Sequence, residues 1–230
     1  MGKENKPVTE KAQIKSRKRV QEHGEVFTAE REVKAMCDLV KDESERIESR
    51  VLEPACGDGN FLAEILNRKL ATVTKCCGKC VSDWEKYSIV ALSSLYGVDI
   101  MPDNAQECRD RLFKIWKEAH VENVGNEGIP EIEDAARYIL NTNILCGDAL
   151  TMCQSNGEPI VFAEWNIVCE NYMKRRDFEF KTMLRMQDNG EQRDMFDSSE
   201  EYDKSTGAFL PQPLREYKPI QYWRVQWLTQ

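Results

Sequence analysis

Short apolar runs alternate along the chain with longer stretches in which apolar residues recur at helical spacing. Four runs have the length of buried strands: residues 51–52, 95–100, 143–146 and 160–163. Helical patterns lie before and between the first three of them, at residues 28–40, 61–70, 84–94 and 103–119. Because short buried strands alternate with helices, this pattern predicts an α/β fold, with a doubly wound, largely parallel sheet and helices on both faces.

The pattern changes after residue 170. Residues 174–206 are dominated by charged side chains and hold too few apolar positions for a second core, so we expect one helix near 178–187 and a mobile acidic loop at 188–203. An extended aromatic tail at 211–227 is expected to pack on the domain or on a partner. The predicted organisation is a basic N-terminal arm at 1–22, one domain at 23–170 and a charged, irregular extension at 171–230.

Composition excludes several classes of protein. The chain has 230 residues, of which 41% are hydrophobic and 31% charged, which argues against disorder, collagen-like repeats and a fibrous rod. No apolar run approaches the roughly 18 residues of a membrane-spanning helix. The first residues also lack the apolar stretch of a secretory signal. We therefore expect a cytoplasmic protein with no membrane partner.

The charge balance bears on nucleic-acid binding. Forty acidic residues against 32 basic ones give a formal net charge of -8, which disfavours binding to a polyanion by bulk electrostatics. The N-terminal arm is a local exception, with basic residues at Lys3, Lys6, Lys11, Lys15, Arg17, Lys18 and Arg19. Such an arm could contact DNA phosphates, although a short basic terminus is more often a solvated tail.

The nine cysteines are expected to be reduced thiols, because their number is odd and no secretory signal is present. Cys77 and Cys80 form a Cys-x-x-Cys pair within residues 72–83, which we expect to be a loop. A structural zinc site needs four ligands, usually two such pairs, and no second pair follows. We predict no metal site here, and binding of a metal by Cys77 and Cys80 remains the alternative.

Three of the predicted strands end in groups suited to a polar ligand. Gly57 and Gly59 follow the first strand, where backbone N–H groups and a helix N-terminus can approach a ligand closely. Asp99 ends the second strand and could accept both hydroxyl groups of a ribose, and Asp148 follows the third and could accept from an exocyclic amine such as that of adenine. Ligands of open α/β sheets bind outside the carboxyl ends of the strands. The sequence therefore predicts a nucleoside-type site.

The first of these segments resembles a known motif. Residues 53–62, EPACGDGNFL, look like the S-adenosylmethionine motif of DNA adenine-N6 methyltransferases, in particular the modification subunits of bacterial restriction-modification systems, whose usual form is DPACGSGNFL. Residues 24–28, GEVFT, are similar to the segment that packs against the methionine end of the cofactor, with Ala29 where proline is usual. Residues 97–100, GVDI, and 147–150, GDAL, match the ribose and adenine motifs. The resemblance covers residues 24 to about 165.

The resemblance implies a Rossmann-like methyltransferase fold with S-adenosylmethionine as the cofactor. Cys56 lies inside the motif, where a small residue packs under the turn, and we interpret it as a packing residue and not as a nucleophile. The residues that the resemblance assigns to the cofactor are Phe27, Thr28, Glu53, Pro54, Ala55, Cys56, Gly57, Gly59, Asn60, Phe61, Asp99, Ile100, Asp148 and Ala149.

The catalytic motif of the family is missing. That motif is Asp/Asn-Pro-Pro-Tyr/Phe, in which the first side chain and a proline carbonyl accept hydrogen bonds from the target amine and the aromatic ring stacks on the flipped base. Here the run at 160–163 is followed by Glu164, Trp165 and Asn166, and no two prolines are adjacent anywhere. Glu164 and Trp165 could imitate an acceptor and a stacking ring, without the carbonyl geometry that the prolines impose. The catalytic residues therefore stay unknown.

Three functions remain open at this point. The leading hypothesis is an S-adenosylmethionine-binding relative of the DNA adenine-N6 methyltransferases that does not methylate alone, and that meets DNA through its basic arm or through a second subunit. The second is a non-enzymatic interaction module that keeps the fold and binds through the acidic loop and the aromatic tail. The third is a methyltransferase with another acceptor, because cofactor motifs do not specify the acceptor.

Overall fold

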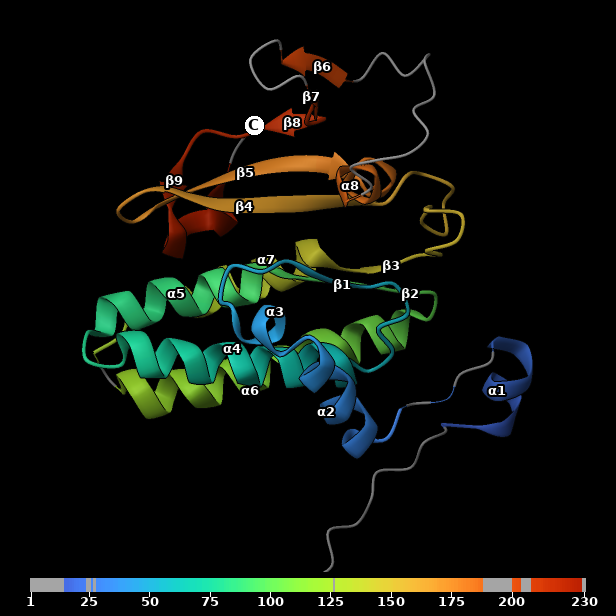
Figure 1. The fold of residues 1–230 in the computed structure, drawn as a ribbon, viewed down its shortest axis with the longest axis horizontal. Coiled ribbons are helices and arrows are strands. Elements are labelled where there is room, and N and C mark those ends of the chain that lie inside the picture. Colours follow the sequence, from blue (N-terminus) through green and yellow to red (C-terminus); the bar gives the residue numbers. More distant parts are fainter. Residues whose placement is uncertain are drawn as a thin grey trace, which may run out of the picture.

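The computed structural model describes residues 15–23, 26, 28–125, 127–187, 200–203 and 208–228. Figure 1 shows parallel strands between a layer of helices and a second group of strands. The helices are α1 (Arg17–His23), α2 (Glu30–Leu39), α3 (Lys41–Glu45), α4 (Asn60–Cys77), α5 (Val81–Ser93), α6 (Pro102–Val124), α7 (Ile132–Asn143), α8 (Phe180–Gln187) and the 3-10 helix η1 (Tyr222–Trp227). The strands are β1 (Val51–Glu53), β2 (Leu95–Asp99), β3 (Ile144–Cys146), β4 (Val161–Cys169), β5 (Tyr172–Glu179), β6 (Glu200–Asp203), β7 (Ala208–Pro211), β8 (Arg215–Glu216) and β9 (Ile220–Gln221).

Strands β1, β2 and β3 form a parallel sheet in that order, with Leu52 opposite Tyr96 and Val98 opposite Leu145. All five residues of the central strand β2 are buried, as expected for a strand that is covered on both faces. Leu95 of β2 belongs to the main core cluster, to which α4 and α6 also contribute. These two helices follow β1 and β2 and lie against the sheet in Figure 1.

The other face of the parallel sheet packs on β4 and α8. Tyr96 and Val98 form a second core cluster with Ile160, Phe162 and Phe180. The ring of Phe162 lies edge-on to the rings of Tyr96 and Phe180, with a centroid distance of 5.4 Å in each case. A strand and a helix from the later part of the chain therefore cover this face.

The expectation that residues 160–163 form a fourth strand of the parallel sheet is wrong. Strand β4 instead pairs antiparallel with β5, with Phe162 opposite Phe178, in a separate sheet that also contains β8 and β9. Only Glu170 and Asn171 separate β4 from β5. A loop this short joins antiparallel strands, because a parallel crossover needs about a dozen residues or more. The parallel sheet and its helices are compatible with a Rossmann-like fold, and a doubly wound sheet stays a prediction.

Several helices differ from the expected ranges. Helix α4 continues to Cys77 and α5 begins at Val81, so most of residues 72–83 are helical and not a loop. Helix α7 was missed, although its face of Ala135, Ala136, Ile139 and Leu140 is fully buried. The helix expected near residues 178–187 is confirmed as α8.

The C-terminal extension packs on the domain. Met173 of β5 and Tyr222 and Val225 of η1 belong to the main core cluster. Residues 188–199 of the predicted acidic loop, and Lys3, Lys6 and Lys11 of the predicted basic arm, lie outside the described residues. In the described part of the chain, no helix combines the length and the apolar character needed to cross a membrane.

A polar cluster joins β5, α7 and the segment before η1. The guanidinium group of Arg175 donates to both carboxylate oxygens of Asp177, at 2.6 and 3.1 Å, and to the hydroxyl oxygen of Tyr138, at 2.7 Å. The hydroxyl of Tyr217 donates to Asp177 at 3.2 Å. Because Asp177 is buried and Arg175 nearly so, this cluster ties the extension to the domain.

Lys69 of α4 is fully buried. Its ammonium group donates to the carbonyl oxygens of Ile47 and Ser49 and to the hydroxyl of Ser94. Burial lowers the pKa of Lys69 to about 7, while the charge of Arg46 adds to this shift and the charge of Glu43 opposes it. An unfolded chain has a lysine pKa of about 10.4. Between these two values the unfolded state therefore binds more protons than the folded state.

We expect the contribution of Lys69 to the free energy of unfolding to be constant below pH 7 and to rise above it, by at most about 1.4 kcal/mol per pH unit. Denaturant unfolding of the wild type and of Lys69→Met at pH 6, 7, 8 and 9 measures this rise. The difference between the two proteins cancels the other titrating groups. A difference that stays constant from pH 7 to 9 would contradict a lowered lysine pKa.

Candidate functional site

A cavity of about 550 Å³ lies at the carboxyl ends of β1, β2 and β3. Ligands of open α/β sheets bind at this edge. The cavity is lined by the segment before α2, the turn after β1 and the segments after β2 and β3, with the residues Val26, Thr28, Glu53, Pro54, Ala55, Cys56, Gly57, Asp58, Asn60, Phe61, Asp99, Ile100, Met101, Asn104, Gly147, Asp148, Ala149 and Leu150.

The structure brings the predicted cofactor residues together. All of them line this cavity except Phe27 and Gly59. Phe27 lies outside the described residues, and Gly59 is the residue directly before α4. Segments that are far apart in the sequence, from Thr28 to Ala149, thus meet around one space.

The turn after β1 depends on its glycines. Gly57 and Gly59 have φ angles of 53° and 86°, in the left-handed region that favours glycine. A Cβ atom at Gly59 would lie 2.7 Å from the Sγ atom of Cys108, because α6 packs directly on the turn. The N–H of Cys56 donates to the carbonyl of Val98 at 2.9 Å, which fixes the turn against β2. The N-terminus of α4 is therefore held at the edge of the cavity.

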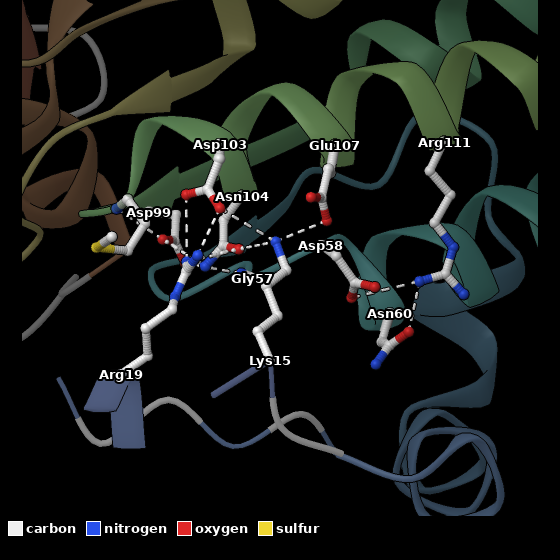
Figure 2. A network of polar contacts seen from close by, with 11 residues as sticks. Lys15, Arg19, Gly57, Asp58, Asn60, Asp99, Asp103, Asn104, Glu107 and Arg111 are labelled. Atoms are coloured by element: carbon white, nitrogen blue, oxygen red, sulfur yellow. Dashed lines mark hydrogen bonds and ion pairs between the residues drawn. The ribbon is translucent and has the colours of Figure 1, made fainter. Parts of the chain in front are cut away.

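Asp99 ends β2 and is held at the wall of the cavity by three hydrogen bonds. Its Oδ2 atom accepts from the backbone N–H of Gly57 at 2.9 Å. Its Oδ1 atom accepts from the N–H of Met101 at 2.8 Å and from the amide of Asn104 at 3.1 Å. Figure 2 shows Asp99 between the glycine turn and the first turn of α6. A carboxylate offers about four acceptor positions, so this orientation leaves room for a ligand hydroxyl.

Asp148 follows β3 and has apolar neighbours on the rim of the cavity. Its Oδ1 atom accepts from the N–H of Leu150 at 2.8 Å, which stabilises the turn. Ile100 and Leu150 are 54% and 93% exposed, and Ala149 is half-buried. Exposed apolar side chains beside a carboxylate form a surface suited to a flat ring that carries an amine.

The cavity is acidic. Its lining residues include the carboxylates of Glu53, Asp58, Asp99 and Asp148, and none of those described is lysine or arginine. Burial raises the pKa of Glu53, and a backbone hydrogen bond from Ala55 partly offsets this effect. Carboxylates on the lining favour a cationic or neutral ligand over a phosphate. Arg111 beside Asp58, and Lys15 and Arg19 beside Asn104, offset part of this negative charge.

Sequence reasoning missed the contribution of α6. Arg111 donates to Asn60 at 2.5 Å and is 3.4 Å from Asp58, and Asn60 in turn donates to the carbonyl of Thr28 at 3.2 Å. These contacts join α6, the glycine turn and the segment before α2, and Figure 2 shows Arg111 of α6 beside Asp58 and Asn60. The one sequence signal for a contribution of α6 to the cavity is Asn104, a polar residue shortly after Asp99 in the first turn of that helix.

Glu164 and Trp165 do not line the cavity. Glu164 is buried and lies 2.5 Å from the guanidinium groups of both Arg50 and Arg176. Arg50 directly precedes β1, so Glu164 lies at the amino end of that strand, opposite the glycine turn. Trp165 packs edge-on against the ring of Tyr138. The structure therefore does not bring this pair to the predicted cofactor residues.

The cysteines give no metal centre in the described part of the chain. No group of three or more His, Cys, Asp or Glu side chains could hold a metal ion there. The pKa of Cys56 is raised, mainly by a hydrogen bond with the thiol of Cys108 and next by burial. A thiol with a raised pKa is a poor nucleophile at neutral pH, which agrees with a packing role.

Comparisons of this chain with the profiles of known protein families, with curated proteins and with solved structures returned no match.

Proposed function

We propose that this chain binds S-adenosylmethionine in the cavity at the carboxyl ends of β1, β2 and β3. The observation that carries the proposal is that the glycine turn, Asp99 and Asp148 line one cavity of about 550 Å³. Sites for small ligands are typically about 300 to 1,000 Å³ in volume. The cavity is therefore large enough for a nucleoside-sized cofactor.

The residues present suit each part of this cofactor. Asp99 would accept a hydrogen bond from a ribose hydroxyl, and Asp148 would accept from the adenine amine. Ile100 and Ala149 would bury the faces of the base, which explains why Ile100 is so exposed in the structure. Thr28 lines the cavity and belongs to the segment that the resemblance assigns to the methionine end.

The charge of the cavity favours binding of this cofactor over binding of nucleotides, which carry phosphates. S-adenosylmethionine carries a sulfonium, an ammonium and one carboxylate, so its net charge is positive. ATP and the dinucleotides carry several negative phosphate charges, which four carboxylates at the cavity wall would repel. A glycine turn at a helix N-terminus alone would have suited phosphates equally well.

We propose further that this chain does not transfer a methyl group to DNA alone. The bound cofactor would supply an electrophilic methyl group, while the chain supplies residues that hold it. Adjacent prolines are absent from the sequence, and Glu164 is held by two arginines away from the cavity. A second subunit that provides the acceptor-binding groups would complete the methyltransferase site.

Calorimetry on the purified chain tests the proposal. We expect S-adenosylmethionine to bind, and ATP, which shares the adenosine but not the charge, to bind at least about 100-fold more weakly because of repulsion in the acidic cavity. The same preparation, given cofactor with a radiolabelled methyl group, is expected to leave DNA unlabelled.

Two results would overturn this assignment. Equal affinity for ATP would show that the acidic lining does not select the ligand, and no binding of S-adenosylmethionine would favour the interaction-module hypothesis. Labelled DNA would show that the chain carries its own catalytic groups.

A further inference from the structure

Lys15, shortly before helix α1, and Arg19 of that helix contact the first turns of α6. The ammonium of Lys15 lies 2.7 Å from the carboxylate of Glu107, and the guanidinium of Arg19 lies 2.5 Å from the carboxylate of Asp103. The hydrogen bond from Arg19 holds the pKa of Asp103 at about 2. Figure 2 shows both cations reaching from the N-terminal segment toward α6 at the edge of the glycine turn.

Both cations also reach Asn104, which lines the cavity and is only 2% exposed. The Oδ1 atom of Asn104 accepts from Lys15 at 2.7 Å and from Arg19 at 3.2 Å. The Nδ2 group of the same side chain donates to Asp99 at 3.1 Å. Two cations on one end of the amide fix which end faces Asp99, because a flipped amide would set its oxygen against the carboxylate.

We propose that Lys15 and Arg19 are positioning residues of the cofactor site, which hold the Asn104 amide so that Asp99 is oriented for a ribose hydroxyl. This inference rests on the proposed function and adds a part of the chain that no cofactor motif includes. The side chains of Lys15 and Arg19 are 25% and 19% exposed, so they are more enclosed than ordinary surface cations. Their effect acts through Asn104 and not through direct contact with a ligand.

Arg17 provides a matched control within the same helix. Its side chain is exposed, and the contacts between described residues include none from Arg17 to α6. Replacing Arg17 by Ala removes one positive charge from the arm without touching Asn104. A general electrostatic effect of the arm on the cavity would therefore appear in this variant as well.

The test is calorimetry with S-adenosylmethionine on the full chain. We expect Lys15→Ala/Arg19→Ala to weaken binding about fivefold to tenfold, because Asp99 loses its fixed hydrogen-bond partner. Arg17→Ala is expected to stay within about twofold of the wild type, and Lys15→Arg/Arg19→Lys, which keeps both cations, to stay within about threefold. The thermal midpoint of each variant checks that the fold is retained.

A double-mutant cycle with Asn104→Ala separates positioning from a merely structural role. If the cations act through Asn104, their removal from the Asn104→Ala protein has no further effect on affinity. Equal losses in both backgrounds, or unchanged affinity of the Lys15→Ala/Arg19→Ala chain, would overturn the inference while leaving the proposed function intact. No binding by the wild type would overturn both proposals.

Discussion

Replacing Asp99 by Ala is expected to weaken S-adenosylmethionine binding by about 10-fold to 100-fold. Asp99 already accepts three hydrogen bonds within the chain, so one acceptor position is left for a ribose hydroxyl, and a hydrogen bond to a charged acceptor contributes roughly 1.5 to 3 kcal/mol. It also frees the N–H of Gly57, which Asp99 holds in the turn. Calorimetry or equilibrium dialysis measures the loss.

Two further variants make this result specific. Asp99→Asn keeps the size of the side chain but places an NH₂ group where a carboxylate oxygen accepts, so we expect most of the loss to remain. Asp110→Ala removes an exposed carboxylate from the same side of the fold, on α6, and is expected to leave affinity unchanged. Affinity that survives Asp99→Ala would refute the assignment of Asp99 to the ribose.

Asp177→Leu is expected to lower the free energy of unfolding by about 3 to 5 kcal/mol, the usual cost of removing one partner of a buried ion pair. Arg175 would keep its hydrogen bond to Tyr138 but lose both bonds to the carboxylate. The variant would then keep the nearly buried guanidinium of Arg175 without its counter-ion, which destabilises the folded state. Urea unfolding followed by tryptophan fluorescence measures the loss.

The paired variant Arg175→Met/Asp177→Leu is the control for this prediction. The guanidinium of Arg175 lies 4.8 Å from the ring centroid of Tyr217 and 5.6 Å from that of Trp165, so an apolar side chain would pack among rings. Replacing a whole buried ion pair by apolar residues is often nearly neutral. We expect the double variant to recover most of the stability, and a loss below 1 kcal/mol in Asp177→Leu would contradict the role of the pair.

Most residues that line the cavity could be predicted from the sequence, because they follow the ends of strands. Asp99 and Asp148 lie at or shortly after the end of an apolar run, Gly57 lies in the turn that follows another, and the carboxyl ends of parallel strands meet at one edge. The pairing of β4 was missed because a short apolar run alone does not distinguish parallel from antiparallel strands. Its signal was the brief interruption at Glu170 and Asn171.

The contacts of the N-terminal segment could not be predicted in the same way. Lys15 and Arg19 meet α6 residues that are 84 to 92 positions later in the chain. Ion pairs at such separations leave no periodic pattern, and any of many acidic residues would have been an equal candidate. Helix α7 does carry a sequence signal, since Ile132, Ala135, Ala136, Ile139 and Leu140 recur at helical spacing after Pro130.

The pairing of the arm with α6 has a reciprocal consequence. The ammonium of Lys15 has three donors and already contacts Asp103, Asn104 and Glu107, so it can bind a phosphate only by giving up one of these contacts. If docking of Lys15 and Arg19 on α6 raises the affinity for the cofactor by some factor, bound cofactor raises the equilibrium constant for docking by the same factor, because such coupling is reciprocal. A higher concentration of cofactor, relative to its dissociation constant, would then lower the fraction of chains in which Lys15 and Arg19 are released to bind a polyanion.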